Sequence, residues 1–266
     1  MKEIRKIRLF VNDNDKSRHI YDIIYKKLIE NDFEITEDNF DLGIAVGGDG
    51  SFLRMIKKCN FNSDALYIGV NSGTLGFAQE VNIEQIDEFI EDLKEGNFKV
   101  DEIGIEEITI TTDNNKERFY SLNEIVIRQK ELNVAVLNIS IDDVFLEKFV
   151  GDGILISTSF GTTAYNLSFG GSIIFNTFHS LQITPIAPLH NKVYKSLTNS
   201  IVIPQKKIIK VVPEENKSDL LITIDGENKV FDNVKLIEAT VDEKRIKCLR
   251  RLDYDFFEKV NEKFLR

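Results

Sequence analysis

An apolar run followed directly by a glycine-rich turn limits what this chain can fold into. Residues 42–46 are Leu-Gly-Ile-Ala-Val, a nearly continuous apolar segment that is typical of a strand covered on both faces in a parallel sheet. Three of the next four residues, 47–50, are glycine, so the backbone there can take positive φ and let another group come close. Ser51 suits the N-cap of a helix that we expect to extend to Cys59. The stretch predicts a strand, a tight turn and a helix.

Asp49 lies inside this turn and does not suit a simple phosphate-binding loop. Helix N-termini behind glycine turns attract phosphates. A carboxylate beside a phosphate is repelled unless it accepts a proton or works with a metal ion. Asp49 is therefore a candidate for reaction chemistry. Asp is also common in turns, so the Gly-Gly-Asp-Gly turn on its own fits a purely structural role equally well.

Strands and helices alternate in the N-terminal part of the chain. Besides the stretch above, we predict strands over residues 7–11 and 65–70 and helices over residues 17–31 and 83–93. Gly96 marks the end of the second of these helices. This alternation predicts a parallel, Rossmann-like α/β sheet. Ligands bind such sheets outside the carboxyl ends of the strands. The glycine turn and a second glycine-bearing loop, residues 71–77, both fall there.

Beyond Gly96 the sequence changes to short β-prone segments separated by polar turns. They cover residues 98–110, 118–128, 134–141, 144–150, 154–157, 201–203, 208–212, 220–224 and 234–241. A helix over 162–169 interrupts them and stops at two glycines, and an amphipathic helix is predicted over 254–265. The predicted fold class is an α/β N-terminal domain followed by a β-rich, sandwich-like C-terminal domain.

Composition excludes several classes of function. The 266 residues carry a net charge of -10, which provides no basic surface for nucleic acid or an anionic membrane. Cys59 and Cys248 form no Cys-x-x-Cys pair, and we expect both to be reduced. The N-terminus lacks the apolar region of a signal peptide, and no run has the length of a membrane span. We expect a cytoplasmic protein.

Motifs that are absent from the sequence narrow the chemistry further. There is no Gly-x-x-x-x-Gly-Lys-Ser/Thr loop, no Gly-x-Gly-x-x-Gly and no Gly-x-Ser-x-Gly elbow. The three histidines have no metal-ligand spacing, so no metal site is predicted. A carboxylate in a phosphate loop, with amides and hydroxyls that suit ribose and base, indicates phosphoryl transfer to a nucleotide hydroxyl.

Four further clusters place polar residues beside glycine or at strand ends. They are Asn123-Glu124, Gly151-Asp152-Gly153, the segment 157–168 and Asp225-Gly226. Each also has a structural explanation. Taken alone, Asp225-Gly226 is best read as the turn of a hairpin. Asn123-Glu124 also fits the polar entry of a strand, and Asp152 a bulge residue. For Thr162, Thr163 and Ser168, helix capping and a functional role fit equally well.

Taken together and in this order, the motifs closely resemble the NAD kinase family over nearly the whole chain. The Gly-Gly-Asp-Gly turn is shared with lipid kinases and 6-phosphofructokinases. The segment Thr163-Ala164-Tyr165-Asn166-Leu167-Ser168 with Asn123-Glu124 upstream is far more specific. The remaining matching segments are Asn71–Phe77, Gly151–Gly153 and Thr184–Pro188.

The resemblance implies where the domains divide and which residues act. It implies an α/β domain over 1–98, joined by the C-terminal helix 253–266, and a β-rich NAD-binding domain over 99–252, with NAD bound between them. Asp49 would be the general base that accepts the proton of the 2′-hydroxyl, and Phe77 would face the adenine. Substrate contacts are implied for Asp49, Gly50, Phe77, Asn123, Glu124, Asp152, Thr163, Ala164, Tyr165, Asn166, Leu167, Ser168 and Ala187.

The resemblance also implies the partners of the reaction. NAD would receive the terminal phosphoryl group of ATP, polyphosphate or another nucleoside triphosphate, giving NADP, and a divalent ion such as Mg²⁺ would arrive on the donor's phosphates. Homodimers or homotetramers are expected. The alternatives are a lipid or sugar-phosphate kinase that shares the glycine turn, and a catalytically weak dinucleotide-binding regulator.

Three residues depart from the family pattern. Val150 stands where a basic residue is frequent, and Lys148 is a possible substitute for it. Ser159-Phe160 stands where Pro-Thr is usual, beside the adenine pocket that the resemblance implies, and Glu227 follows Asp225-Gly226 where Gln is common. These departures concern substrate contacts, whereas Asp49 is unaffected.

Overall fold

The computed structural model describes residues 3–11, 15–71, 76–131, 133–215 and 218–266, which form two compact units. Unit 1 comprises Met1–Ile103 with Arg245–Arg266, and unit 2 comprises Gly104–Lys244. The divisions fall inside the long strands β6 (Phe98–Thr112) and β17 (Val234–Arg251), a few residues from the predicted boundaries. The chain thus passes from one unit to the other within continuous strands and not through a linker.

Unit 1 is built on a parallel sheet, as predicted. Its strands are β1 (Lys6–Val11), β2 (Glu34–Ile35), β3 (Leu42–Gly47), β4 (Leu66–Asn71) and β5 (Gln79–Asn82). β3 lies between β1 and β4, with Leu42 opposite both Ile7 and Leu66. Lys247 and Cys248 of β17 pair with β4 in parallel. All these pairings are parallel, so the carboxyl ends of β3 and β4 lie at the same edge of the sheet.

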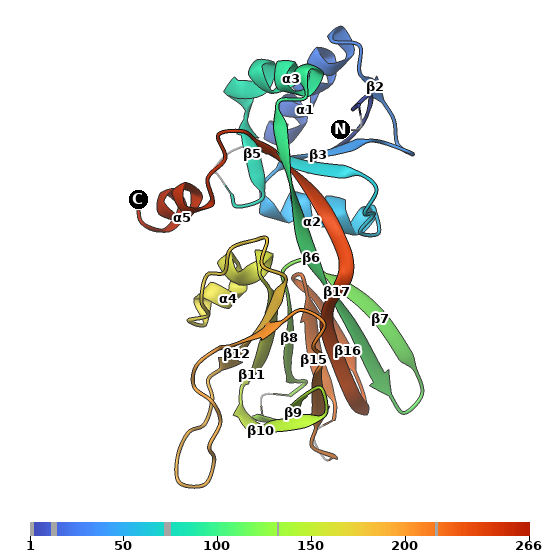
Figure 1. Cartoon of the computed structure of the whole chain (residues 1–266). Coiled ribbons are helices and arrows are strands. Elements are labelled where there is room, and N and C mark those ends of the chain that lie inside the picture. Colours follow the sequence, from blue (N-terminus) through green and yellow to red (C-terminus); the bar gives the residue numbers. More distant parts are fainter. Residues whose placement is uncertain (1–2, 12–14, 72–75, 132, 216–217) are drawn as a thin grey trace. The chain divides into compact units, whose positions relative to one another are not determined.

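Helices cover both faces of this sheet (Figure 1). They are α1 (Asp15–Glu30), α2 (Asp49–Lys58), the 3₁₀ turn η1 (Ile83–Gln85) and α3 (Ile86–Glu95). Leu42, Ile44 and Val46 share one apolar cluster with residues of α1 and α3. Gly43 points the other way, because a Cβ there would lie 3.2 Å from the Met55 sulfur of α2. Alternate residues of β3 therefore face opposite helical layers, which explains why the whole strand is apolar.

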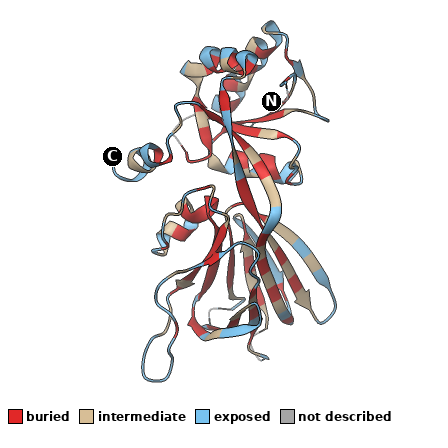
Figure 2. Ribbon diagram, viewed as in Figure 1, coloured by how far each residue is buried: buried red, intermediate tan, exposed pale blue. Residues whose placement is uncertain are grey.

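Unit 2 consists of two antiparallel sheets packed around a common core. One sheet has the order β13 (Ile201–Pro204), β12 (Ser180–Ile186), β11 (Gly153–Thr158), β8 (Glu124–Gln129), β15 (Leu220–Ile224) and β16 (Glu227–Phe231). The other contains β10 (Val144–Gly151), β9 (Ala135–Ile141), β14 (Ile209–Pro213), β17, β6 and β7 (Lys116–Ser121). Apolar side chains from both sheets form one cluster, which appears as the buried interior of the strands in Figure 2. The sandwich predicted from the sequence is confirmed.

Several local predictions are wrong. Ser51 is not an N-cap: α2 begins at Asp49 with Gly48 as its N-cap, and the Gly48 carbonyl accepts the Ser51 N–H at 2.8 Å. The turn after β3 is therefore shorter than predicted, because the helix already begins at Asp49. The predicted helix 162–169 is two short pieces, η2 (Phe160–Thr163) and α4 (Tyr165–Ser168), because Ala164 has non-helical angles of φ -97° and ψ -131°.

Strand positions also differ from prediction. The run 118–128 is two strands, β7 and β8, and the strands β2, β5 and β12 were not predicted at all. The final helix, α5 (Phe256–Phe264), is confirmed, with Asp255 accepting the backbone N–H groups of residues 257 and 258 as its N-cap. Most of the predicted loop 71–77 lies outside the described residues. No helix within the described ranges is both long and apolar enough to cross a membrane.

Candidate active site

Asp49 stands in the first turn of α2, directly after the carboxyl end of β3. Its carboxylate accepts the backbone N–H of Phe77 at 3.1 Å and that of Ala78 at 2.9 Å. The residue is half-buried, while Gly48 and Gly50 on either side of it are exposed. Two amides thus fix the orientation of the carboxylate, and the turn leaves it accessible. This is the arrangement that a general base requires.

A glycine and a buried amide complete the surroundings of Asp49. A Cβ at Gly76 would lie 2.1 Å from Asp49 Oδ1 and 2.4 Å from Gln79 Oε1, so only glycine fits there. Gln79 is fully buried, and neither its amide oxygen nor its nitrogen has a hydrogen-bond partner among the described residues. Ala78 and Gln79 belong to no recognisable motif, so no sequence signal marks them.

The ring of Phe77 is enclosed within unit 1. It stacks on Phe264 at a centroid distance of 5.4 Å and contacts Phe256 at 6.1 Å, both from α5. Only 6% of Phe77 is exposed. The predicted contact with adenine stays a prediction, and the structure shows a second role for this ring, which is to hold α5 against the segment that carries the amides of Asp49.

In unit 2, the Asp225 carboxylate organises the turn that presents Asn123 and Glu124. It accepts the backbone N–H groups of Leu122 at 2.8 Å, Asn123 at 2.7 Å and Glu124 at 3.3 Å, together with the Ser121 hydroxyl at 3.0 Å. The predicted hairpin is also present, since Ile224 pairs with Glu227 and Asp225 has φ 46°. Sequence reasoning identified the turn but missed the carboxylate's role, which depends on contacts about a hundred residues apart.

Three acidic side chains gather at this turn, and their pKa values all move upward. Burial, followed by the charge of Asp225, raises the pKa of Glu124 to about 8. Burial also raises the pKa of Asp225, while the Leu122 and Asn123 amides oppose the rise. Glu106 is completely buried, and burial raises its pKa well above the ordinary range, followed by the charge of Asp225, while the Ser121 hydroxyl opposes the rise. Burial therefore favours the protonated form of Glu106 and Glu124.

The segment 160–168 packs directly against Asn123. A Cβ at Gly161 would lie 2.1 Å from the Asn123 carbonyl oxygen, which also accepts the Thr158 N–H at 2.9 Å. The close approach therefore requires glycine at 161. Of the predicted contact residues in this segment, Tyr165 and Ser168 are exposed and three are half-buried, namely Thr163, Ala164 and Leu167.

Asn166 has a structural role in the fold, and its predicted contact with substrate stays a prediction. It is fully buried, its amide nitrogen donates to the Thr162 carbonyl at 3.2 Å, and its oxygen accepts the Thr184 hydroxyl at 2.6 Å. These bonds tie α4 to β12. Tyr165, by contrast, keeps its side chain at the surface, where its hydroxyl accepts a hydrogen bond from Arg128 at 3.1 Å.

Asp152 and Ala187 lie across from each other where β10 turns into β11 beside β12. The Asp152 N–H donates to the Ile186 carbonyl at 3.0 Å, and a Cβ at Gly151 would lie 2.7 Å from the Ala187 oxygen. Both predicted residues are exposed. Ala187 has φ 44°, a strained conformation for alanine that is most frequent at functional sites.

The structure therefore gathers the predicted residues into two groups. Asp49, Gly50 and Phe77 belong to unit 1, and the other ten belong to unit 2. Among the described residues, no three His, Cys, Asp or Glu side chains are grouped as a metal site would require.

Comparisons with known proteins match both units. A family described as "ATP-NAD kinase N-terminal domain" matches residues 9–98, and one described as "ATP-NAD kinase C-terminal domain" matches residues 122–239. An NAD kinase of Finegoldia magna is 36% identical, with 97% of each chain covered. An NAD kinase of Streptococcus gordonii is 32% identical over 98% of this chain and 96% of its own.

Two solved structures share the fold. Yeast NADH kinase complexed with NADH superimposes with a TM-score of 0.87 at 18% identity, covering 100% of this chain and 88% of that one. An NAD kinase from Archaeoglobus fulgidus in complex with ATP gives a TM-score of 0.76 at 21% identity, covering 97% and 99%.

Proposed function

The chain belongs to the NAD kinase family, and from this membership we propose how its residues phosphorylate NAD to NADP. The Asp49 carboxylate accepts the proton of the 2′-hydroxyl on the adenosine ribose. The ribose oxygen then forms a bond to the terminal phosphorus of the donor. The bond between that phosphorus and the bridging oxygen breaks, so ADP leaves when ATP is the donor. The products are NADP and ADP.

One observation carries this proposal. Asp49 is a half-exposed carboxylate at the start of α2, behind a strand end in a parallel sheet, and two backbone amides orient it. A positioned carboxylate that accepts a hydroxyl proton typically contributes about 10² to 10⁴ in rate. The N-terminus of α2 beside it favours the donor's phosphates.

ATP is our proposed donor, since the solved Archaeoglobus fulgidus relative is described as a complex with ATP. Mg²⁺ would come bound to the donor and so counts as part of that substrate. Asn123, Glu124 and residues 163–168 are proposed contacts to NAD. The homodimer or homotetramer and the cytoplasmic location stay predictions from the sequence.

The test is a coupled assay. The protein is incubated with NAD, ATP and Mg²⁺, and an NADP-specific dehydrogenase reports the product. We expect NADP formation that requires both NAD and a divalent ion. Polyphosphate in place of ATP measures donor preference. No NADP at micromolar enzyme would exclude the proposed reaction and leave the regulator hypothesis.

A further inference from the structure

Helix α5 contributes a buried lysine to the segment that holds Asp49. Only 8% of Lys259 is exposed. Its ammonium donates to the Phe77 carbonyl at 3.4 Å, to the Gln79 carbonyl, and to the Glu80 carboxylate at 3.2 Å. An ammonium has three N–H donors, so these acceptors occupy all of them. Every acceptor lies within residues 77–80, although Lys259 is about 180 residues further along the chain.

One peptide group joins Lys259 to Asp49. The carbonyl of Phe77 accepts from Lys259, and the N–H of Ala78, which belongs to the same peptide group, donates to Asp49 Oδ1 at 2.9 Å. A trans peptide is planar, with its C=O and N–H directed to opposite sides. The orientation of this carbonyl therefore fixes the orientation of the N–H. A cation on the carbonyl also polarises the group and strengthens the hydrogen bond on its other side.

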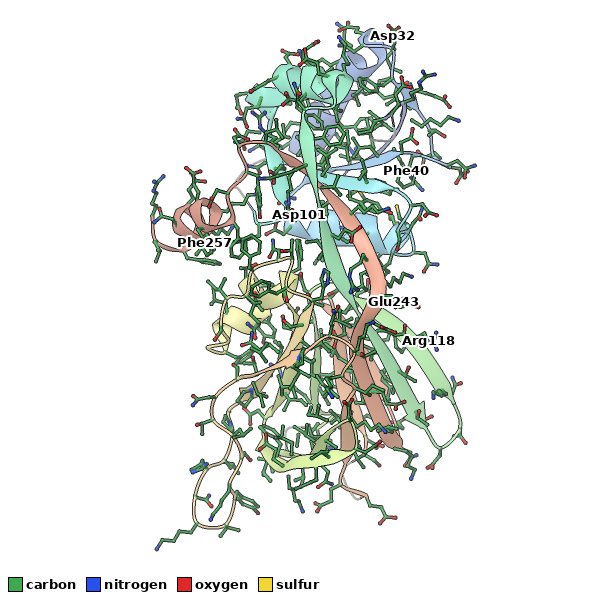
Figure 3. All side chains as sticks on the ribbon, in the orientation of Figure 1. Asp32, Phe40, Asp101, Arg118, Glu243 and Phe257 are labelled. Atoms are coloured by element: carbon green, nitrogen blue, oxygen red, sulfur yellow. The ribbon has the colours of Figure 1, made fainter. Side chains whose placement is uncertain are left out.

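Charge balance does not account for Lys259. The Glu80 carboxylate already pairs with Arg250 at 3.1 Å, and Arg250 pairs with Asp101 of β6 at 3.0 Å; Asp101 is labelled in Figure 3. Glu80 would thus keep a cationic partner without Lys259. The charged groups that act on the ammonium are Glu80, Arg250 and Asp49, and burial lowers the pKa of Lys259 while Glu80 opposes the change.

Apolar contacts attach α5 independently of its lysine. The rings of Phe256 and Phe264 both contact Phe77, whereas Phe257 of the same helix, labelled in Figure 3, is exposed. A change at Lys259 should leave this attachment in place.

We propose that Lys259 is a positioning residue for the reaction, because it orients the peptide group between residues 77 and 78 that holds the Asp49 carboxylate. The inference rests on the proposed role of Asp49 as the general base. It assigns the C-terminal helix a part in catalysis without contact to substrate.

The first test compares Lys259→Met with Lys263→Met. Methionine keeps an unbranched chain and removes the donors, and Lys263 is an exposed lysine of the same helix. A misplacement of the order of 1 Å can cost about 10²-fold in rate. For Lys259→Met we expect kcat to fall by about 10- to 100-fold, with KM for NAD within about threefold of wild type. Lys263→Met should match wild type, and Lys259→Arg, which keeps a cationic donor, should recover most of the loss. An unchanged kcat in Lys259→Met would overturn the proposal.

The second test repeats Lys259→Met in an Asp49→Asn background. If Lys259 acts through Asp49, the second change should lower kcat by less than about threefold, because residues that act as a unit are not additive. An equal loss in both backgrounds would mean that Lys259 has a general structural role. The proposed function fails separately, if Asp49→Asn alone retains activity. Thermal denaturation shows whether each variant is folded, and Lys259→Gln replaces Lys259→Met if the latter is unfolded at the assay temperature.

Discussion

In unit 1 the Asp49 carboxylate accepts two backbone N–H groups, whereas in unit 2 the Asp225 carboxylate accepts three and a hydroxyl as well. The first anchors one turn and keeps free acceptor capacity beside exposed glycines. The second uses both oxygens to hold the backbone of residues 122–124. A carboxylate with few donors remains available as a base, while one with many donors acts as part of the framework.

Glu106 and Glu124 extend this comparison to buried acids that have few donors. One Glu124 oxygen has no hydrogen-bond partner among the described residues, and the Tyr165 backbone N–H and the Ser121 hydroxyl lower the pKa values of Glu124 and Glu106 less than burial raises them. Burial then favours the protonated form, which is the direction in which the pKa values of both groups move. The number of hydrogen-bond donors and the degree of burial thus distinguish a reactive, a structural and a neutral carboxyl group within one chain.

The largest effect is expected for Asp49→Asn. The amide keeps the shape but loses basicity, so kcat should fall by about 10² or more. The structure adds that one of the two amide donors would face the new NH₂ group, at a cost of about 1–3 kcal/mol in stability. Steady-state kinetics with calorimetric NAD binding measures the first effect and thermal denaturation the second.

Asp64→Asn is a matched control for that variant, since Asp64 is an exposed aspartate of the same unit. It should leave kcat and NAD binding at wild-type values. If Asp49→Asn retained more than about a tenth of wild-type kcat, Asp49 would be only a turn residue, and the contrast between the two units would lose its functional meaning.

The next largest effect is expected for Asp225→Asn, which tests the structural carboxylate. Asn-Gly is as good a hairpin turn as Asp-Gly, so the turn itself should persist. The new NH₂ group cannot accept, and at least one backbone N–H among residues 122–124 would lose its partner, which costs about 1–3 kcal/mol. We expect KM for NAD to rise by about tenfold, which corresponds to about 1.4 kcal/mol, with a smaller change in kcat.

Asp232→Asn controls for the loss of an acidic charge in the same unit. Asp232 forms an exposed pair with Lys130 at 2.8 Å, and such pairs contribute about 0–1 kcal/mol. Kinetics and denaturation should both stay close to wild type. If Asp225→Asn behaved like this control, the hydrogen bonds of its carboxylate would not determine the position of Asn123-Glu124.

A smaller effect is expected from pH. The pKa of Glu124 rises from 4.5 in the unfolded chain to about 8 in the folded protein, so the folded state binds more protons between these values. Its contribution to the free energy of unfolding is therefore complete below pH 4.5 and is lost as pH rises toward 8. The slope is at most about 1.4 kcal/mol per pH unit for one such group.

Glu124→Gln cannot titrate and should flatten the pH dependence of Tm over this window, as should Glu106→Gln. A wild-type slope in both variants would contradict the assignment.

The sequence predicted those parts of the molecule whose causes are local. The strand, turn and helix of residues 42–58 follow from apolar periodicity and three adjacent glycines, and Gly96 ends its helix with φ 74° as expected. The Asp225-Gly226 hairpin is equally local.

The contacts that sequence patterns missed join distant residues. Asp225 binds a turn about a hundred positions away, Phe77 packs on the last helix, and Lys259 reaches back to the segment beside Asp49. No periodicity records such pairs. The Ser51 cap and the continuous 162–169 helix were wrong because glycine and alanine dihedral angles, at Gly48 and Ala164, decided the helix boundaries.

The smallest effect is expected for Lys148, whose ion pair involves a half-exposed carboxylate and not a buried one. Val150 is buried and has no charge to offer a phosphate, and Lys148, two residues earlier, is the cation considered as a substitute for the frequent basic residue. In the structure its ammonium pairs with Glu214 at 2.7 Å, and about half of each side chain is exposed. Water screens a pair that is this exposed, so the pair should contribute about 0–1 kcal/mol. Lys148→Ala should therefore leave Tm nearly unchanged and KM for NAD within about twofold of wild type.

Glu214→Ala serves as the matched variant, because it breaks the same pair and keeps the cation. If KM for NAD rose several-fold in Lys148→Ala but not in Glu214→Ala, Lys148 would bind substrate phosphate. An exposed charge in unit 2 would then contribute more to substrate binding than its exposure indicates.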